Sequence, residues 1–182
     1  PVEPGLFEDR FIPGLRRLSS RLKDEGAGTA AQLITSYHVI FADGNPEIVA
    51  PSPVMNQLMR VVPRALTVDE IRQIVREYGS AARRAREGGF DAVEILVGGG
   101  YLLNRFLSPI SNKREDEYGG DLQNRMRIIL EVIESIKREA GADFPIGCRL
   151  NVQEQMPEGH TIEESGIVAG ILEKAGIDVI NA

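Results

Sequence analysis

Apolar residues recur at steps of three and four positions in four segments of the chain. This spacing places them on one side of an α-helix, so each segment is predicted as a helix with one buried face. In chain order the apolar residues are Phe11, Leu15, Leu18 and Leu22; Ile71, Ile74, Val75 and Tyr78; Met126, Ile129, Leu130, Ile133 and Ile136; and Ile167, Val168, Ile171 and Leu172. The pattern therefore predicts four amphipathic helices.

Residues that favour helix ends flank these segments. Asp9 can cap the first helix, and the third is expected over about 122–139. T-x-x-E patterns predict capping boxes at the second and fourth helices, formed by Thr67 with Glu70 and by Thr161 with Glu164. A glycine follows each helix and can end it: Gly26, Gly88, Gly141 and Gly176.

Short apolar runs alternate with the helices. They cover 29–34, 91–96, 145–150 and 178–182 and are predicted as strands. Their apolar character is continuous, which is typical of strands buried on both faces in a parallel sheet covered by helices. Two architectures fit this α/β pattern, an open doubly wound sheet and a (β/α) barrel. The proline-rich stretch at about 41–66 has no clear period and is predicted as a loop insertion.

Composition limits the function classes. The chain has 182 residues, 42% of them hydrophobic, and a net charge of -6, so we expect one domain and no nucleic-acid partner. The basic clusters are expected to be solvated or ion-paired: Arg83, Arg84 and Arg86, and Lys113 with Arg114. Cys148 is expected to be inert core, and His38 and His160 lack the spacing of metal ligands, so no metal is expected. Neither a membrane span nor a signal peptide is evident, which predicts a cytoplasmic protein.

The carboxyl ends of parallel strands are where ligands bind in α/β folds. Here these ends carry Gln32, the run Gly98–Gly100 followed by Tyr101, then Arg149 and Asn151. An arginine in an apolar strand needs an anion or an acceptor, and either a ligand or an ion pair with a residue such as Glu94 would meet that need. The glycines do not complete a G-x-G-x-x-G phosphate loop, because Leu103 stands at its last position.

The stretch FLSPISNKREDEYGGDLQNRMR, 106–127, closely resembles the Old Yellow Enzyme family of flavin oxidoreductases. The resemblance is to the branch that holds 2,4-dienoyl-CoA reductase, 2-enoate reductase and trimethylamine dehydrogenase. Similar runs are ALTVDEIRQIVREYGSAARRAREGGFDAVEI at 65–95, AAQL at 30–33 and APSP at 50–53. The resemblance implies an FMN-binding (β/α)8 TIM barrel, of which residues 1–182 would form about four central βα units, strands three to six.

The resemblance also implies roles for single residues. Gln32 would meet the pyrimidine edge of FMN, and Arg149 would stabilise the negative charge of the reduced flavin. Tyr101 would protonate the substrate carbon, since a phenol keeps its proton at neutral pH. NAD(P)H would be the reductant. A longer parent could add a 4Fe-4S cluster and FAD, although this chain carries no ligands for them.

Two positions depart from the family pattern. Leu96 and Gly99 stand where the family has the polar pair that binds a substrate carbonyl oxygen. QLITSYH at 32–38 likewise departs from the usual Q-L-x-H-x-G-R. We expect Leu96, Gly98, Gly99 and Gly100 to line the substrate pocket, with the carbonyl held in another way, for example by backbone amides.

The expected function is therefore NAD(P)H-driven, FMN-dependent reduction of an activated alkene, such as an enoate or an enoyl thioester. The partners expected are a small-molecule substrate and other copies of the chain in a homo-oligomer. Two alternatives remain: a flavin amine dehydrogenase or demethylase, and a non-catalytic barrel fragment that serves in assembly. A barrel lyase is less consistent, because no catalytic lysine or metal-binding carboxylate cluster stands at a strand end.

Overall fold

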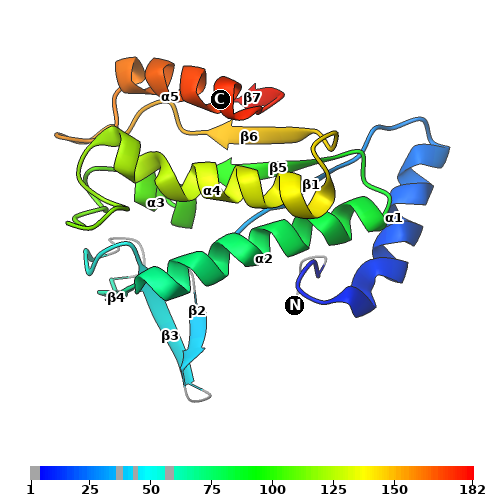
Figure 1. The fold of residues 1–182 in the computed structure, drawn as a ribbon, viewed down its shortest axis with the longest axis horizontal. Helices are drawn as coiled ribbons and strands as arrows, with labels where there is room; N and C mark the ends of the chain where they lie inside the picture. The colour runs from blue at the N-terminus through cyan, green and yellow to red at the C-terminus, as the bar shows by residue number, and fades with distance from the viewer. Residues whose placement is uncertain (1–4, 36–38, 43–44, 56–59) are drawn as a thin grey trace.

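Figure 1 shows the computed structural model of the protein, which describes residues 5–35, 39–42, 45–55 and 60–182. His38 and the end of the QLITSYH run lie outside these ranges. The helices are η1 (Asp9–Phe11), α1 (Ile12–Asp24), α2 (Val68–Glu87), α3 (Leu102–Leu107), α4 (Leu122–Ala140) and α5 (Ile162–Ala175). The strands are β1 (Ala30–Leu33), β2 (Val39–Ala42), β3 (Asn45–Ala50), β4 (Arg64–Ala65), β5 (Ala92–Val97), β6 (Ile146–Leu150) and β7 (Val179–Asn181).

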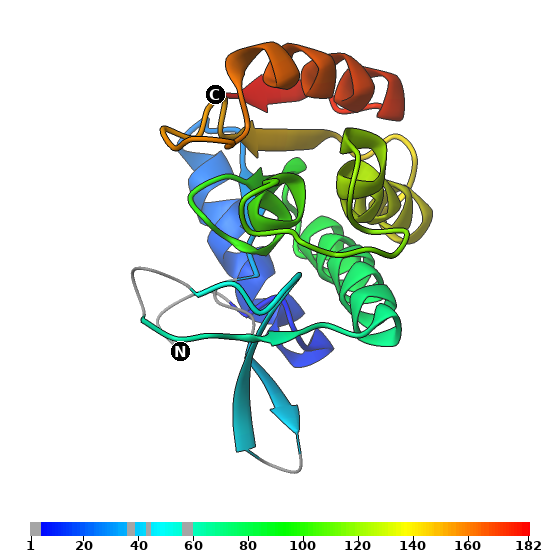
Figure 2. The same cartoon turned by 90° about the vertical axis from the view of Figure 1, so that its left-hand side faces the viewer.

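The main sheet is parallel, with the strand order β1-β5-β6-β7. Each strand follows a helix in the chain, and α2, α4 and α5 lie along one side of the sheet (Figures 1 and 2). Helices α2, α3, α4 and α5 share one hydrophobic core with strands β1, β5 and β6. All four predicted strands and all four predicted helices are present.

The strands are not buried on both faces, which corrects the sequence-based prediction. Successive side chains of a strand point to opposite faces, and one face packs against the helices through Leu33, Ile95 and Cys148. On the other face Gln32 and Arg149 are exposed. The continuous apolar runs suggest two covered faces, but on the second face the described residues bury Leu96 and leave Gln32 and Arg149 exposed.

Local capping signals largely act as predicted. Thr67 and Glu70 form the complete capping box of α2. Thr161 accepts from the backbone N–H of Glu164, but the Glu164 carboxylate accepts from Arg125 and from His160 Nδ1 (2.7 Å) instead of closing the box.

Two predictions about α1 are wrong. Asp9 makes no capping hydrogen bond, because its carboxylate accepts from Arg84 (2.6 Å) and Arg83 (2.7 Å) of α2. These hydrogen bonds, first that of Arg84, lower the pKa of Asp9. Of the predicted buried stripe only Leu15 is buried, whereas Leu18 and Leu22 are 42% and 43% exposed.

The segment predicted as a loop insertion contains secondary structure. A small second sheet has the order β2-β3-β4, with β2 and β3 antiparallel and β3 and β4 parallel. It projects away from the main sheet in Figure 2. The strands were missed because each is short and prolines interrupt the pattern. Helix α3 was not predicted, because its six residues are too few to show a helical period.

None of the helices in the described part of the chain is long and apolar enough to cross a membrane.

The main sheet has two edge strands, β1 and β7, and β7 leaves Val179 and Ile180 64% and 37% exposed. Unpaired edges and apolar patches promote association. We therefore expect the 182-residue chain, expressed alone, to self-associate in sedimentation velocity experiments. Val179→Lys should reduce this association, because a charge on an edge strand opposes strand pairing. A chain that sediments as a monomer at all concentrations tested would contradict this expectation.

Candidate functional site

At the carboxyl end of β5 the backbone turns sharply through Gly98, Gly99 and Gly100. Gly99 and Gly100 have φ values of 64° and 76°, in the left-handed region that only glycine adopts without cost. Tyr101 follows as the N-cap of α3, and its N–H donates to Gly98 O at 3.2 Å. The glycines are therefore required by the shape of the turn, which places Tyr101 at the strand end.

Two asparagine side chains hold this turn. Asn151 Oδ1 accepts from Gly99 N–H at 3.2 Å, and Asn104 Oδ1 accepts from Gly100 N–H at 2.9 Å. Asn104 is 3% exposed, and its Nδ2 has no hydrogen-bond partner among the described residues. Both backbone N–H groups are thus already paired. The idea that these two amides bind a substrate carbonyl is therefore not supported.

The open face of the sheet carries the residues predicted to meet a flavin. Gln32 of β1 lies beside Glu94 of β5 in the strand register and donates to it from Nε2 at 2.6 Å. Arg149 of β6 lies beside Leu96 of β5. The predicted alternative, an ion pair between Arg149 and Glu94, is not formed, and no described carboxylate lies within ion-pair distance of the guanidinium.

These residues fit the edge of a flavin ring in their chemistry. Arg149 is an exposed guanidinium with no described carboxylate partner, so its charge is available to an anion. The Gln32 amide uses one N–H for Glu94, which leaves a second N–H and its oxygen for a ligand. Their strands are separated by β5, which puts the two backbones about 10 Å apart, a distance that a planar tricyclic ring can bridge.

The loop from Phe106 to Gly120 is held by its own polar side chains. Asn112 is buried and donates from Nδ2 to the carbonyls of Phe106 (2.7 Å) and Tyr118 (2.8 Å). Arg114 donates to the carbonyls of Pro51 (2.8 Å) and Leu66 (2.6 Å) and pairs with Asp116. The motif that carries the family resemblance therefore ties α3 to the second sheet, and its polar groups act on the scaffold.

Burial keeps two other ionisable groups of this region neutral. Burial, and then the hydrogen bond to Glu131 (2.9 Å), raises the pKa of the Tyr118 phenol to about 12. Burial also raises the pKa of the Cys148 thiol to about 12, so this cysteine is a core residue, as predicted.

The basic clusters are paired or solvated, as predicted. Arg83 pairs with Asp9 and Glu87, Arg86 with Asp143, and Arg114 with Asp116. No group of three or more metal-ligating side chains occurs in the described ranges.

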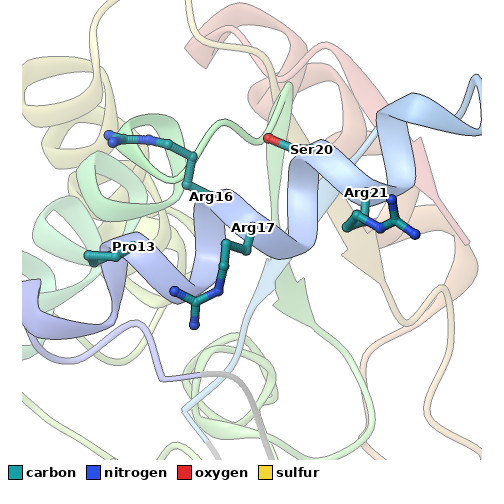
Figure 3. A pocket seen from close by; sticks show the side chains of 5 residues that line it. All are labelled: Pro13, Arg16, Arg17, Ser20 and Arg21. Carbon is teal, nitrogen blue, oxygen red and sulfur yellow. The ribbon is translucent and has the colours of Figure 1, made fainter.

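A surface hollow lies on α1 (Figure 3). It is lined by Pro13, Arg16, Arg17, Ser20 and Arg21. Helix α1 lies at the end of the sheet opposite the carboxyl ends of the strands (Figure 1). The hollow is therefore separate from the candidate site.

An added Cβ would have different effects at Gly98 and at Gly100. A Cβ on Gly98 would lie 2.9 Å from Asn151 Oδ1, whereas one on Gly100 would meet nothing within 4 Å but would require the strained φ of 76°. We expect Gly98→Ala to displace the Asn151 amide and to speed hydrogen exchange at Gly99 N–H about 10-fold. Gly100→Ala should instead cost about 1 kcal/mol of stability through backbone strain. Unchanged exchange at Gly99 in Gly98→Ala would contradict the proximity of Asn151.

Comparison with known proteins identifies the class. The whole chain, residues 1–182, matches the model of the NADH:flavin oxidoreductase / NADH oxidase family, so the chain belongs to this family. Its members are FMN enzymes that take electrons from a reduced nicotinamide. The fold is that of their TIM barrels, of which the chain holds about four βα units.

The individual relatives are longer than this chain. It is 44% identical to a protein named metal reductase from Desulforamulus reducens (97% of this chain, 26% of that protein) and 37% identical to an NADPH dehydrogenase from a Geobacillus species (97% and 51%). Among solved structures it resembles 2-naphthoyl-CoA reductase (TM-score 0.88, 34% identity, 97% and 29%) and histamine dehydrogenase from Rhizobium sp. 4-9 (TM-score 0.79, 34% identity, 90% and 25%). The chain thus spans between about a quarter and about half the length of these relatives.

The structure brings the seven predicted site residues to one region. Leu96, Gly98, Gly99, Gly100 and Tyr101 lie at the end of β5, and Gln32 and Arg149 lie on the open face of the neighbouring strands. Asn104 and Asn151, which hold the glycine turn, had no role predicted from the sequence. The position of Asn151 could have predicted a role in the site, because it directly follows β6 and stands two residues after Arg149.

Proposed function

We propose that the protein carrying this chain is an FMN-dependent oxidoreductase that reduces an activated alkene with NAD(P)H as electron donor. The observation that carries the proposal is the exposed Arg149 guanidinium. It has no described carboxylate partner and lies on the same face of the sheet as Gln32. In a family of flavin enzymes, this supports a role for Gln32 at the pyrimidine edge of the flavin and for Arg149 beside the ring atoms that gain negative charge on reduction.

Each residue has a distinct task in this proposal. FMN, when bound, supplies hydride transfer. Gln32 orients the ring through its free amide groups, and Arg149 stabilises negative charge on the reduced ring. Tyr101, positioned by the glycine turn, gives a proton to the α-carbon of the alkene.

The relatives support alkene reduction but also define the alternatives. The resemblance to 2-naphthoyl-CoA reductase is compatible with an unsaturated thioester as substrate. The resemblance to histamine dehydrogenase supports an amine oxidation as the second candidate. The name of the Desulforamulus reducens relative adds metal ions as acceptors to be tested.

The test uses the complete protein. Purified protein should show flavin absorbance that bleaches when NADH or NADPH is added without oxygen. Crotonyl-CoA or 2-cyclohexen-1-one should then restore the absorbance, whereas histamine should not reduce the oxidised protein. A colourless protein that takes up no FMN would leave only the non-catalytic, assembly role. Reduction by histamine, or reoxidation by ferric citrate alone, would replace alkene reduction with the corresponding alternative.

A further inference from the structure

Asn151 lies where the strand ends of β5 and β6 meet. Its backbone N–H donates to Val97 O at 3.1 Å, which extends the pairing of the two strands by one residue. Because side chains alternate along a strand, Asn151 is on the same face as Arg149, two residues before it. Its side chain is partly exposed. Asn151 therefore lies on the open face at the end of the sheet where ligands bind in this architecture.

The orientation of the Asn151 amide follows from its hydrogen bond. Gly99 N–H is a donor and requires an acceptor, so the amide oxygen faces Gly99, at 3.2 Å. The Nδ2 group, which has two N–H donors, must then point elsewhere. Within residues 5–35, 39–42, 45–55 and 60–182, no acceptor is hydrogen bonded to it.

The glycine turn makes room for this amide and links it to Tyr101. A Cβ at position 98 would lie 2.9 Å from Asn151 Oδ1, so only glycine leaves the amide in place. A Cβ at position 99 would lie 3.2 Å from the Tyr101 ring. Asn151, Gly99 and Tyr101 are therefore in one continuous cluster.

We propose that Asn151 Nδ2 donates the hydrogen bond that binds and polarises the carbonyl oxygen of the substrate. This assignment rests on the proposed alkene reduction. It accounts for the two positions where the polar pair of the family is absent, because Leu96 cannot donate and the Gly99 N–H is already used by Asn151 itself. The substrate class is an alkene conjugated with one carbonyl group, as in an enone or an enoyl thioester.

The role of the donor follows from the electron balance of the reaction. The β-carbon of the alkene would take the hydride that bound, reduced FMN supplies, the π electrons would move toward the α-carbon and the carbonyl oxygen, and Tyr101 would give its phenol proton to the α-carbon and be left as a phenolate that solvent reprotonates. Negative charge develops on the carbonyl oxygen in between. A fixed neutral N–H donor stabilises that charge without giving up its proton.

Asn151→Asp separates this role from a purely structural one. A carboxylate still accepts from Gly99 N–H, so the turn keeps its support, but the donor is lost and a negative charge faces the substrate oxygen. We expect reoxidation of the NADH-reduced, complete protein by 2-cyclohexen-1-one to slow about 30-fold or more. Asn151→Ala should also slow it, and Asn124→Asp, the same change on α4, should leave the rate unchanged.

A second readout does not depend on turnover. We use 2-cyclohexen-1-one labelled with ¹³C at the carbonyl, bound to the oxidised protein. In infrared difference spectra its C=O stretch should lie at a lower frequency than that of the same labelled compound free in solution, as in a hydrogen-bonded carbonyl. In Asn151→Asp and Asn151→Ala this shift should be lost. Flavin content of the variants shows that the site is still assembled.

The outcomes are distinct. If the wild type reduces the enone and both Asn151 variants keep its rate within 2-fold and its infrared shift, the role of Asn151 is wrong while alkene reduction stands. If NADH reduces the wild-type flavin and no conjugated alkene reoxidises it, the proposed function fails, and the assignment of Asn151 fails with it.

Discussion

Tyr101→Phe is expected to slow the oxidation of the reduced flavin by a conjugated alkene about 100-fold or more. In the proposed function the phenol supplies the proton that completes the saturated product, and phenylalanine keeps the ring but has no proton to give. Hydride transfer from NADH into the flavin needs no proton at the alkene carbon. Reduction of the flavin by NADH should therefore persist in the variant.

Stopped-flow absorbance measures the two half-reactions separately. Tyr118→Phe is the matched control, because this phenol is buried, donates to Glu131 of α4 and has no part in the proposed site. It should cost stability while leaving the ratio of the two half-reaction rates unaffected. Equal reoxidation rates in wild type and Tyr101→Phe would refute the role of Tyr101 as the acid.

Arg149→Ala is expected to weaken FMN binding about 100-fold and to lower the reduction potential of the bound flavin. The guanidinium has no described carboxylate partner, and in the proposed function its charge stabilises the reduced flavin. Removing it takes stabilisation from the reduced, anionic ring more than from the oxidised, neutral ring. The potential must then fall.

Fluorescence titration with FMN and a dye-equilibration measurement of the potential test both parts. Arg149→Lys keeps the charge and should recover part of the potential, although it lacks the planar fork of arginine. Arg17→Ala on α1 removes an equal charge at the opposite end of the sheet and should change neither quantity. An unchanged potential in folded Arg149→Ala would show that Arg149 has a structural role only.

The helices and the main strands could be predicted because their signals are local. The Thr67–Glu70 box, the apolar stripe of α4 and the left-handed Gly176 after α5 each depend on residues within one or two turns. Short elements without a full period, such as α3 and the strands of the second sheet, gave no such signal. The exposed side of α1 was also misjudged, because periodicity shows that a stripe exists but not that a partner covers it.

The amino-acid sequence by itself determined the order of helices and strands, the glycine turn before Tyr101 and the membership in a flavin oxidoreductase family. Only the tertiary structure decided which face of the sheet is open, that Glu94 pairs with Gln32 and not with Arg149, and that the Asn151 amide reaches Gly99, 52 residues earlier in the chain. The reason is physical. Helix periods and caps arise from neighbours along the chain, whereas these contacts depend on the register of β1, β5 and β6 and on which helices cover the sheet, and both are set by the packing of the whole layer.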